Sequence, residues 1–445
     1  MPDVRPTVGD SSWFVNDRFG LFIHWGIFAP PARHEWVKHR EEIPDEAYRK
    51  YLDHFDPDLY DPEAWAAVAT RAGMKYFVIT TKHHDGFCLW DSQLTEYKAT
   101  NTPAGRDLIG PMVEAFRERG LKVGLYHSLL DWHHPDFAID DLHPLRNRPD
   151  REKLNAGRDQ RRYAAYLRGQ VRELLTGYGK IDLLFYDFSY PATQSGRPEG
   201  FVGKGRDDWE SEKLLALTRE LQPGILVNDR LDLIEAKGGW DYGTPQQFLP
   251  RRWVEVEGQR VVWETCQTFS GSWGYHREES SWKTVEQLVR MLIAVVSRGG
   301  NLLLNVGPTG RGEFDRRALD RLAGIGEWMR RHGRSIYGCT GAPDEIPTPE
   351  DCRLTFDPER KRLYVHLFAW PCRELFLDGL AGRVEYAQLL NDASEVGIVE
   401  PAAHQQEFGG ELGGELGGES GDAIALQLPV VKPDAVVPVV ELFLK

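Results

Sequence analysis

The sequence feature that most constrains the fold is a repeated alternation of short apolar runs with amphipathic segments between about residues 19 and 335. The apolar runs are nearly continuous in Val, Ile and Leu, which is typical of strands buried on both faces of a parallel sheet. Seven such runs are visible, at 19–26, 75–86, 121–132, 180–190, 224–230, 261–266 and 300–308. They are separated by helix-like segments over 61–73, 106–120, 161–179, 209–222 and 284–300. Seven or eight such units predict an α/β fold, a (β/α)8-type barrel.

The pattern changes after residue 335, where short alternating runs replace the strand–helix repeat. No helical pattern of useful length separates these runs, so we expect an antiparallel β-sandwich of about 105 residues. We therefore divide the chain into a catalytic barrel, residues 1–337, and a C-terminal β-sandwich, residues 338–445. The tandem repeat GGELGGELGGES at 409–420 is interpreted as a glycine-rich loop with no assigned role.

The formal net charge of −14 argues against nucleic acid or an anionic membrane as the partner, because both need basic patches. No apolar run approaches the roughly 20 residues that a membrane-spanning helix needs. The N-terminal segment MPDVRPTVGDSSWF shows neither the basic nor the apolar region of a signal peptide, so we expect a soluble cytoplasmic protein. The composition is compatible with a homo-oligomer.

Cofactor motifs are not found in the sequence. The cysteines form no CxxC pair, so we expect neither a disulfide scaffold nor a zinc site. No Walker A or GxGxxG motif precedes a helix, which leaves nucleotide binding without support. His83 and His84 are neighbours on a predicted strand, where successive side chains point to opposite faces, and the HExxH spacing is absent. We therefore predict no metal and no cofactor.

Polar or aromatic side chains stand at the end of each predicted strand. They are His24–Trp25, His83–Asp85, His127, Asp187, Asn228–Arg230, Glu264 and Asn305. In a (β/α)8 barrel the carboxyl ends of all strands meet on one face, and that face carries the chemistry. A single residue of this kind could be a helix cap or a satisfied core group, but seven strands with the same ending predict an active site.

Asp187 is the strongest catalytic candidate, because the apolar strand IDLLFY delivers its carboxylate to this face. Such a carboxylate can attack the anomeric carbon of a sugar or stabilise an oxocarbenium-like transition state. Nearby segments hold further side chains that suit sugar hydroxyls and apolar sugar faces. They are Glu35 and Trp36 in RHEWVKHR, Arg230 after LVND, Trp273 in SGSWGYH, and Glu264 after VVW as a second carboxylate.

These segments resemble the α-L-fucosidases of glycoside hydrolase family 29. The matching stretches, in order from about residue 13 to 312, are WFVNDRFGLFIHWGIFAPPARHEWV, TTKHHDGFCLWDS, GLYHSLLDWHHP, IDLLFYD, LVNDR, WETCQTFSGSWGY and GGNLLLNVGPTGRG. The last block but one is similar to that of the broad-specificity branch. The resemblance implies a barrel followed by a sandwich, and exo-acting, retaining, metal-free hydrolysis of terminal α-L-fucosides on oligosaccharides or glycoconjugates.

Position by position, the resemblance assigns the nucleophile to Asp187 and sugar binding to a larger set. The set is His24, Glu35, Trp36, His83, His84, His127, Arg230 and Trp273. The acid/base is less fixed in the family, and three places stay open: Glu35, Glu264 and the loop between NDR and WET. We favour the loop, because relatives commonly read T-P-E-Q where this chain reads TPQQ at 244–247, which puts Gln246 in the acid/base slot.

Gln246 bears on activity, because an amide is no acid at neutral pH. Loss of the general acid costs about 10²- to 10⁴-fold in rate, and most for poor leaving groups such as a second sugar. We interpret Gln246 as an engineered Glu→Gln change that traps substrate, since the chain otherwise matches the family. The alternative is a natural residue, with Glu35 or Glu264 as the acid or with impaired turnover. Competing functions are a fucose-binding pseudoenzyme and a retaining glycosidase for another sugar, such as galactose.

Overall fold

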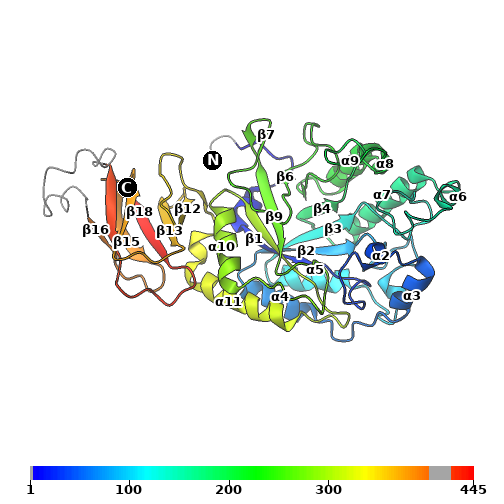
Figure 1. Ribbon diagram of the computed structural model, residues 1–445, viewed down its shortest axis with the longest axis horizontal. Helices are drawn as coiled ribbons and strands as arrows, with labels where there is room; N and C mark the ends of the chain where they lie inside the picture. Colours follow the sequence, from blue (N-terminus) through cyan, green and yellow to red (C-terminus); the bar gives the residue numbers. More distant parts are fainter. Residues whose placement is uncertain (1–3, 400–421) are drawn as a thin grey trace.

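The computed structural model describes residues 4–399 and 422–445, and its larger part is a barrel of eight parallel strands (Figure 1). Around the barrel these are β5 (Leu226–Val227), β4 (Leu183–Asp187), β3 (Lys122–Ser128), β2 (Tyr76–Lys82), β1 (Phe19–Ile23), β10 (Asn301–Val306), β9 (Val262–Thr268) and β6 (Tyr242–Gly243). A parallel bridge between Asn228 and Tyr242 joins the two outermost strands, supported by the Asp241 amide donating to the Val227 carbonyl at 2.7 Å. The sheet therefore closes, and the predicted (β/α)8-type barrel is confirmed.

The strands form because their side chains are buried on both faces, as the continuous apolar runs require. Every residue of β1, β2, β4, β9 and β10 is buried. Inward-facing side chains fill the barrel with an aromatic core, to which Phe22, Tyr76, Tyr126, Phe185 and Tyr242 belong. Outward-facing ones pack beneath the surrounding helices. This filled interior leaves the carboxyl ends of the strands as the place for a pocket.

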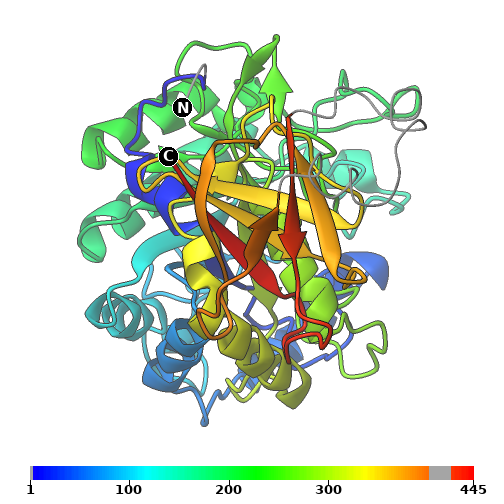
Figure 2. The ribbon, with the colours of Figure 1, turned by 90° about the vertical axis from the view of Figure 1, so that its left-hand side faces the viewer.

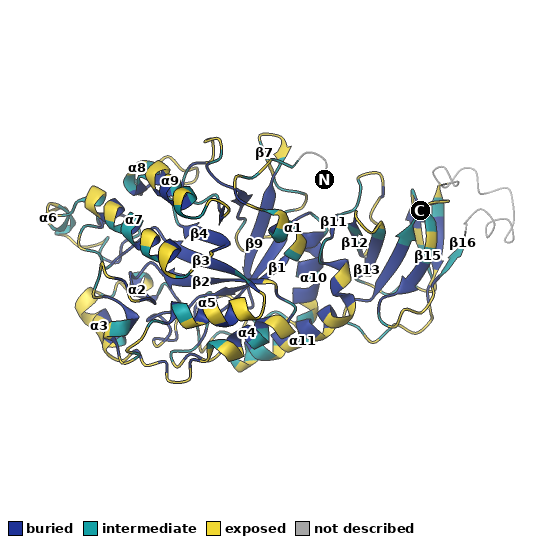
Figure 3. Ribbon diagram, turned by 180° about the vertical axis from the view of Figure 1, so that it is seen from behind, coloured by how far each residue is buried: buried dark blue, intermediate teal, exposed yellow. Residues whose placement is uncertain are grey.

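Six longer helices lie around the strands, each with a buried inner face and an exposed outer face (Figures 1 and 3). They are α4 (Pro62–Arg71), α5 (Ile109–Glu118), α7 (Gln160–Gly177), α9 (Ser211–Leu221), α10 (Val285–Val296) and α11 (Arg316–His332). Shorter ones are α1 (Ser12–Asp17), α2 (Val37–Arg40), α3 (Asp45–Asp53), α6 (Arg151–Asn155), α8 (Arg206–Trp209), and the 3-10 turns η1 (Ala99–Asn101) and η2 (Gly333–Ser335). Their starts follow local chemistry: Asp61 caps α4, and Thr284 with Gln287 forms a capping box on α10.

The barrel departs from a regular repeat between β5 and β9. No helix forms in the fully described segment 228–261, which contains β6 and a small hairpin of β7 (Glu255–Val256) and β8 (Gln259–Arg260). The seven predicted strand runs did not include β6, because two residues are too short to show any periodicity. The long loop after β6 is the segment that carries Gln246.

The smaller part confirms the predicted antiparallel sandwich. One sheet has the order β11 (Thr340–Gly341), β12 (Cys352–Asp357), β13 (Arg362–Leu367), β18 (Val439–Leu444) and β15 (Val384–Leu389), and the other β14 (Glu374–Asp378), β17 (Ala423–Gln427) and β16 (Gly397–Val399). The sandwich lies beside α10 and α11 at one end of the molecule (Figures 1 and 2). There the Trp328 indole donates to the Val437 carbonyl at 2.9 Å. The predicted division at 337/338 falls between η2 and β11, and the repeat at 409–420 lies outside the described residues.

Two findings on the described residues bear on the classes of function considered above. None of their helices is long and apolar enough to cross a membrane. They also hold no group of three or more His, Cys, Asp or Glu side chains that could bind a metal ion.

Candidate active site

A pocket opens at the carboxyl ends of the barrel strands. Its lining is Phe22, His24, Trp36, His83, His84, Tyr126, Phe185, Asp187, Phe188, Gln246, Cys266 and Trp273. Seven of the residues proposed from the sequence therefore meet here. A pocket at this face, lined by aromatic rings and a few polar groups, is typical of a ligand-binding site.

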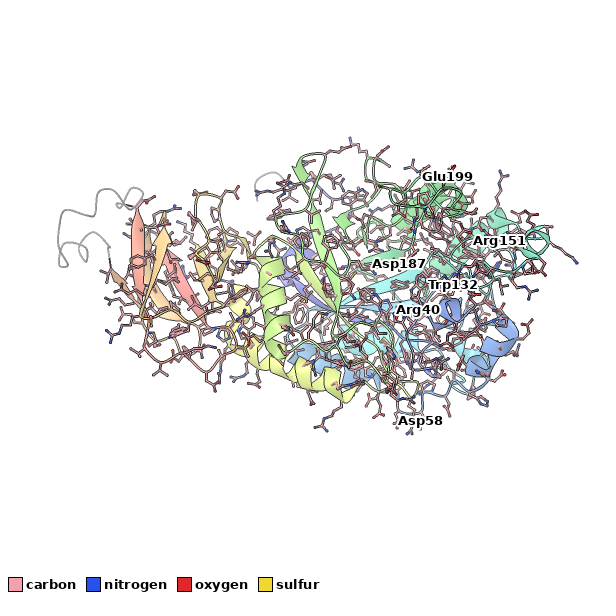
Figure 4. All side chains as sticks on the ribbon, viewed as in Figure 1. Arg40, Asp58, Trp132, Arg151, Asp187 and Glu199 are labelled. Atoms are coloured by element: carbon pink, nitrogen blue, oxygen red, sulfur yellow. The ribbon has the colours of Figure 1, made fainter. Side chains whose placement is uncertain are left out.

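Asp187, labelled in Figure 4, is the last residue of β4 and lines the pocket. Oδ1 accepts a hydrogen bond from Arg230 Nη1 at 2.8 Å, and Oδ2 accepts one from the Tyr126 hydroxyl at 2.9 Å. His84 Nε2 lies 3.9 Å from Oδ2. Burial raises the pKa of Asp187, while Arg230 and Tyr126 act against that rise by favouring the charged form. The site thus holds a buried carboxylate whose charged form is favoured by a cation and a hydroxyl donor.

Arg230 joins Asp187 to Gln246. Its Nη2 donates to Gln246 Oε1 at 3.0 Å, and its Nε donates to Thr244 Oγ1 at 2.9 Å. The loop that carries Gln246 continues β6 alongside β9, because Gln246 forms a parallel bridge with Cys266. Gln246 is exposed at the pocket mouth, where the leaving group of a bound glycoside would depart.

Three histidines supply neutral imidazoles to the pocket. His24 Nδ1 lies 2.6 Å from Asn305 Oδ1, and His84 Nδ1 lies 2.7 Å from the Ser128 hydroxyl. Burial lowers the pKa of His24 to about 3 and that of His83 and His84 well below the usual value. A neutral imidazole can both donate to and accept from sugar hydroxyls.

The expectation that His83 and His84 point to opposite faces is wrong. Strand β2 ends at Lys82, after a register shift between Thr80 and Lys82, so the alternation of a regular strand no longer applies to the two histidines. Both line the pocket, with ring centroids 4.0 Å apart.

Two tryptophans form aromatic walls. The Trp273 ring lies 5.1 Å from the His24 ring, and the Trp36 ring lies 5.0 Å from that of His84. Aromatic rings of this kind pack against the apolar C–H faces of a sugar while the imidazoles take its hydroxyls.

Glu35 is not among the side chains that line the pocket, but its Oε1 has no hydrogen-bond partner among the described residues, so its role as an acceptor of sugar hydroxyls stays a prediction. Its side chain is 1% exposed, and Oε2 accepts hydrogen bonds from the backbone amides of Gly274 at 2.9 Å and Trp273 at 3.2 Å. Burial raises the pKa of Glu35 to about 7. Glu35 therefore anchors the loop that places Trp273 in the pocket wall.

His127 is also placed outside the pocket, contrary to its assignment to the sugar-binding set. It alternates with Tyr126 on β3, so its ring points outward, where Nδ1 lies 3.0 Å from the Thr81 hydroxyl. The inward neighbour Tyr126 was not selected from the sequence, although it contacts the Asp187 carboxylate directly. The alternation of inward and outward side chains along GLYHS was the signal by which Tyr126 could have been selected from the sequence.

Glu264 is not at the carboxyl end of its strand, which corrects the prediction. It is the third residue of β9 and pairs with Asn301, the first residue of β10. Its Oε2 accepts a hydrogen bond from the Tyr76 hydroxyl at 2.5 Å, and burial raises its pKa to about 8. Cys266, two residues further on, lines the pocket, so Glu264 lies one layer below the floor. This position suits a structural carboxylate and not the alternative acid/base.

A (β/α)8 barrel that presents an arginine-bound carboxylate among neutral imidazoles and aromatic rings has the features of a glycoside hydrolase. Comparison with known proteins identifies the family within this class. The family model for alpha-L-fucosidase matches residues 7–334. The chain belongs to this family of α-L-fucosidases, glycoside hydrolase family 29.

Individual relatives support the same assignment. Plasma alpha-L-fucosidase of Homo sapiens is 30% identical over 401 residues, which cover 82% of this chain and 78% of its own. The structure of alpha-L-fucosidase isoenzyme 1 from Paenibacillus thiaminolyticus is 44% identical, covers 98% of both chains and has a TM-score of 0.87. An alpha-L-fucosidase from Bacteroides thetaiotaomicron, 26% identical with full coverage of both chains and a TM-score of 0.81, holds a covalent intermediate trapped with 2-fluoro-fucosyl fluoride in a glutamate-to-glutamine mutant.

Proposed function

We propose that this protein is an exo-acting, retaining α-L-fucosidase scaffold in which Asp187 forms the fucosyl-enzyme and Gln246 occupies the acid/base slot. The observation that carries the proposal is the single guanidinium of Arg230, which binds Asp187 at 2.8 Å and Gln246 at 3.0 Å, both residues that line the pocket. Retention needs the two catalytic groups close together, with carboxyl groups about 5–5.5 Å apart, and a shared arginine holds them near each other.

Asp187 would attack the anomeric carbon while the bond to the leaving oxygen breaks, and water would then release fucose and restore the carboxylate. Arg230 and Tyr126 favour the charged form of Asp187 that this attack requires. The pocket would take one terminal sugar, and the substrates would then be fucosylated oligosaccharides or glycoconjugates cleaved from their ends.

Gln246 would limit the first step. Its Oε1 accepts from Arg230, so its amide hydrogens are left for the glycosidic oxygen, and an amide hydrogen bond transfers no proton. A good leaving group such as nitrophenolate departs without acid help, whereas a sugar alkoxide does not. The trapped intermediate in the Bacteroides relative was likewise obtained with a glutamate-to-glutamine mutant. Gln246 is therefore proposed as a substitution that traps substrate.

The test compares the parent with Gln246→Glu on a nitrophenyl α-L-fucoside and on a fucosylated disaccharide. Gln246→Glu gains about 10²- to 10⁴-fold on the disaccharide and far less on the nitrophenyl substrate. Gln247→Glu is the matched control, because Gln247 is an adjacent exposed amide whose Nε2 instead donates to Thr268 Oγ1 at 2.9 Å. It should gain on neither substrate.

Other outcomes separate the alternatives. Rates on both substrates that stay equal to those of the parent remove Gln246 from the mechanism. Tight fucose binding with no turnover, even in Gln246→Glu, identifies a fucose-binding pseudoenzyme. Faster cleavage of a galactoside than of the fucoside identifies a glycosidase for a different sugar.

A further inference from the structure

The backbone immediately after Asp187 is strained. Phe188 has φ = 86°, a region that glycine enters freely but that a bulky side chain rarely adopts. Conformations of this kind persist only where the surrounding structure enforces them, and they concentrate at functional sites.

The strain changes where the Phe188 ring goes. Along β4, Phe185 and Asp187 face the barrel interior, whereas Tyr186 points outward and its hydroxyl lies 2.6 Å from Thr218 Oγ1 on α9. A regular continuation of the strand would direct residue 188 outward as well, as it does Tyr186. Phe188 lines the pocket instead. The positive φ therefore reverses the alternation and brings the ring to the catalytic face.

Contacts on both sides hold this turn in place. The Asp187 carbonyl accepts from the Leu129 amide at 2.9 Å. On the other side, the Ser189 hydroxyl donates to the Arg230 carbonyl at 2.7 Å and accepts from the Trp209 indole at 3.1 Å. Arg230 thus binds the side chains of both neighbours of Phe188, Asp187 through its guanidinium and Ser189 through its carbonyl. The chain between them has little freedom to relax.

Within the pocket the Phe188 ring contacts two other lining residues. Its centroid lies 5.3 Å from that of His84 and 5.4 Å from that of Trp36. Trp36 also packs against Trp132 at 5.3 Å. Phe188 is therefore one of the rings that fix Trp36, and its removal leaves space into which Trp36 can turn.

We propose that Phe188 is a positioning residue for sugar binding: the strained turn after Asp187 places its ring in the pocket, where it fixes Trp36 and His84. The inference rests on the proposed function in one respect, namely that the pocket takes a fucosyl unit. It predicts an effect on sugar binding and not on the chemical step, because Phe188 acts through Trp36 and His84.

The test measures L-fucose affinity by calorimetry, and kcat and KM on a nitrophenyl α-L-fucoside, in Phe188→Ala, Phe188→Gly and Phe188→Tyr. Phe188→Ala and Phe188→Gly should weaken fucose binding and raise KM by about 10- to 100-fold, because the lost ring contacts serve binding. In both variants kcat should stay within about threefold of the parent. Phe188→Tyr keeps an aromatic ring, so its fucose affinity and its KM should stay within about threefold of the parent. Parent-like affinity in Phe188→Ala or Phe188→Gly would overturn the proposal.

A comparison of Gly with Ala tests the strain. Phe188→Gly should unfold about 1–3 °C above Phe188→Ala, because glycine accepts a positive φ without strain. The matched control is Lys361, exposed in the turn between β12 and β13 with φ = 52°. There Gly should also exceed Ala in stability, with no change in fucose affinity. Phe188→Ala at least as stable as Phe188→Gly would contradict a strained turn.

Failure of this inference is distinct from failure of the proposed function. If the parent binds fucose and cleaves the fucoside but Phe188→Ala is unchanged, only the role of Phe188 is wrong. If the parent neither binds fucose nor cleaves fucosides, the proposed function itself is wrong.

Discussion

Two carboxylates are buried inside the same barrel, and their surroundings give them different properties. Asp187, at the carboxyl end of β4, accepts hydrogen bonds from a guanidinium and a tyrosine. Glu264, below the pocket floor, accepts one from Tyr76, and its Oε1 has no hydrogen-bond partner among the described residues. Burial raises the pKa of both, but only at Asp187 does a cation oppose the rise. A buried carboxylate becomes a usable nucleophile where a positive charge keeps it ionised.

The largest effect expected from this difference is on turnover. Asp187→Asn and Glu264→Gln each replace one barrel carboxylate by an amide of the same shape. Asp187→Asn should lower kcat by about 10⁴-fold or more, because the attacking group is lost. Glu264→Gln should stay within about threefold of the parent. Both are measured on a nitrophenyl α-L-fucoside, with circular dichroism to establish folding; a comparable loss in the two variants would erase the distinction.

The second expected effect is on stability and follows from the proton held by Glu264. Its pKa is about 8 in the folded protein against an ordinary 4.5, so the folded chain keeps a proton that the unfolded chain releases. Stability is therefore lost as the pH rises from about 5 to about 8, by up to about 5 kcal/mol. Glutamine cannot ionise, so Glu264→Gln loses no stability in this way. Its free energy of unfolding should therefore rise relative to that of the parent as the pH rises through this window.

Thermal midpoints at pH 5 and pH 8.5 measure this gain. The control is Glu385→Gln, at an exposed position on β15, whose difference from its parent should be the same at both pH values. A pH-independent difference for Glu264→Gln would mean that Glu264 is charged in the folded protein.

The fold was predicted from the sequence where its signal is long. Runs of five to seven buried apolar residues identified the longer strands, and the helices with a clear apolar face were identified with them. Strands β5 and β6 contain two residues each, too few for a period, and β6 was missed. Buried Thr265, Gln267 and Thr268 concealed the end of β9, so the predicted run ended at 266 and Glu264 was taken for a strand-end residue.

The site was predicted unevenly for a related reason. Asp187 and Arg230 belong to stretches that resemble the family, Gln246 stands where relatives have a glutamate, and the structure brings the three together. His127 was assigned to sugar binding from the resemblance, although the alternation of side chains along β3 turns Tyr126 inward and His127 outward. Phe188 was not selected from the sequence, since a positive φ that reverses the alternation of a strand leaves no signal in a single sequence.

The smallest expected effect concerns the two tyrosines that serve the two carboxylates. Tyr126→Phe removes the 2.9 Å hydrogen bond to Asp187, which should lower kcat/KM by about 10- to 100-fold. Because this bond holds the pKa of Asp187 down, its loss should also move the acid limb of the pH profile to higher pH.

Tyr76→Phe is the counterpart in the layer below, where the lost bond is to Glu264. It should leave kcat/KM unchanged and lower the free energy of unfolding by about 1–3 kcal/mol, because a buried acceptor loses its donor. Loss of activity in Tyr76→Phe would mean that the Glu264 layer also serves turnover. An unshifted acid limb in Tyr126→Phe would mean that Tyr126 does not adjust the charge of Asp187. Either result would contradict the distinction between the two layers. The opposite pattern separates them: hydrogen bonds above the floor adjust the charge of the nucleophile, and those below it stabilise the barrel.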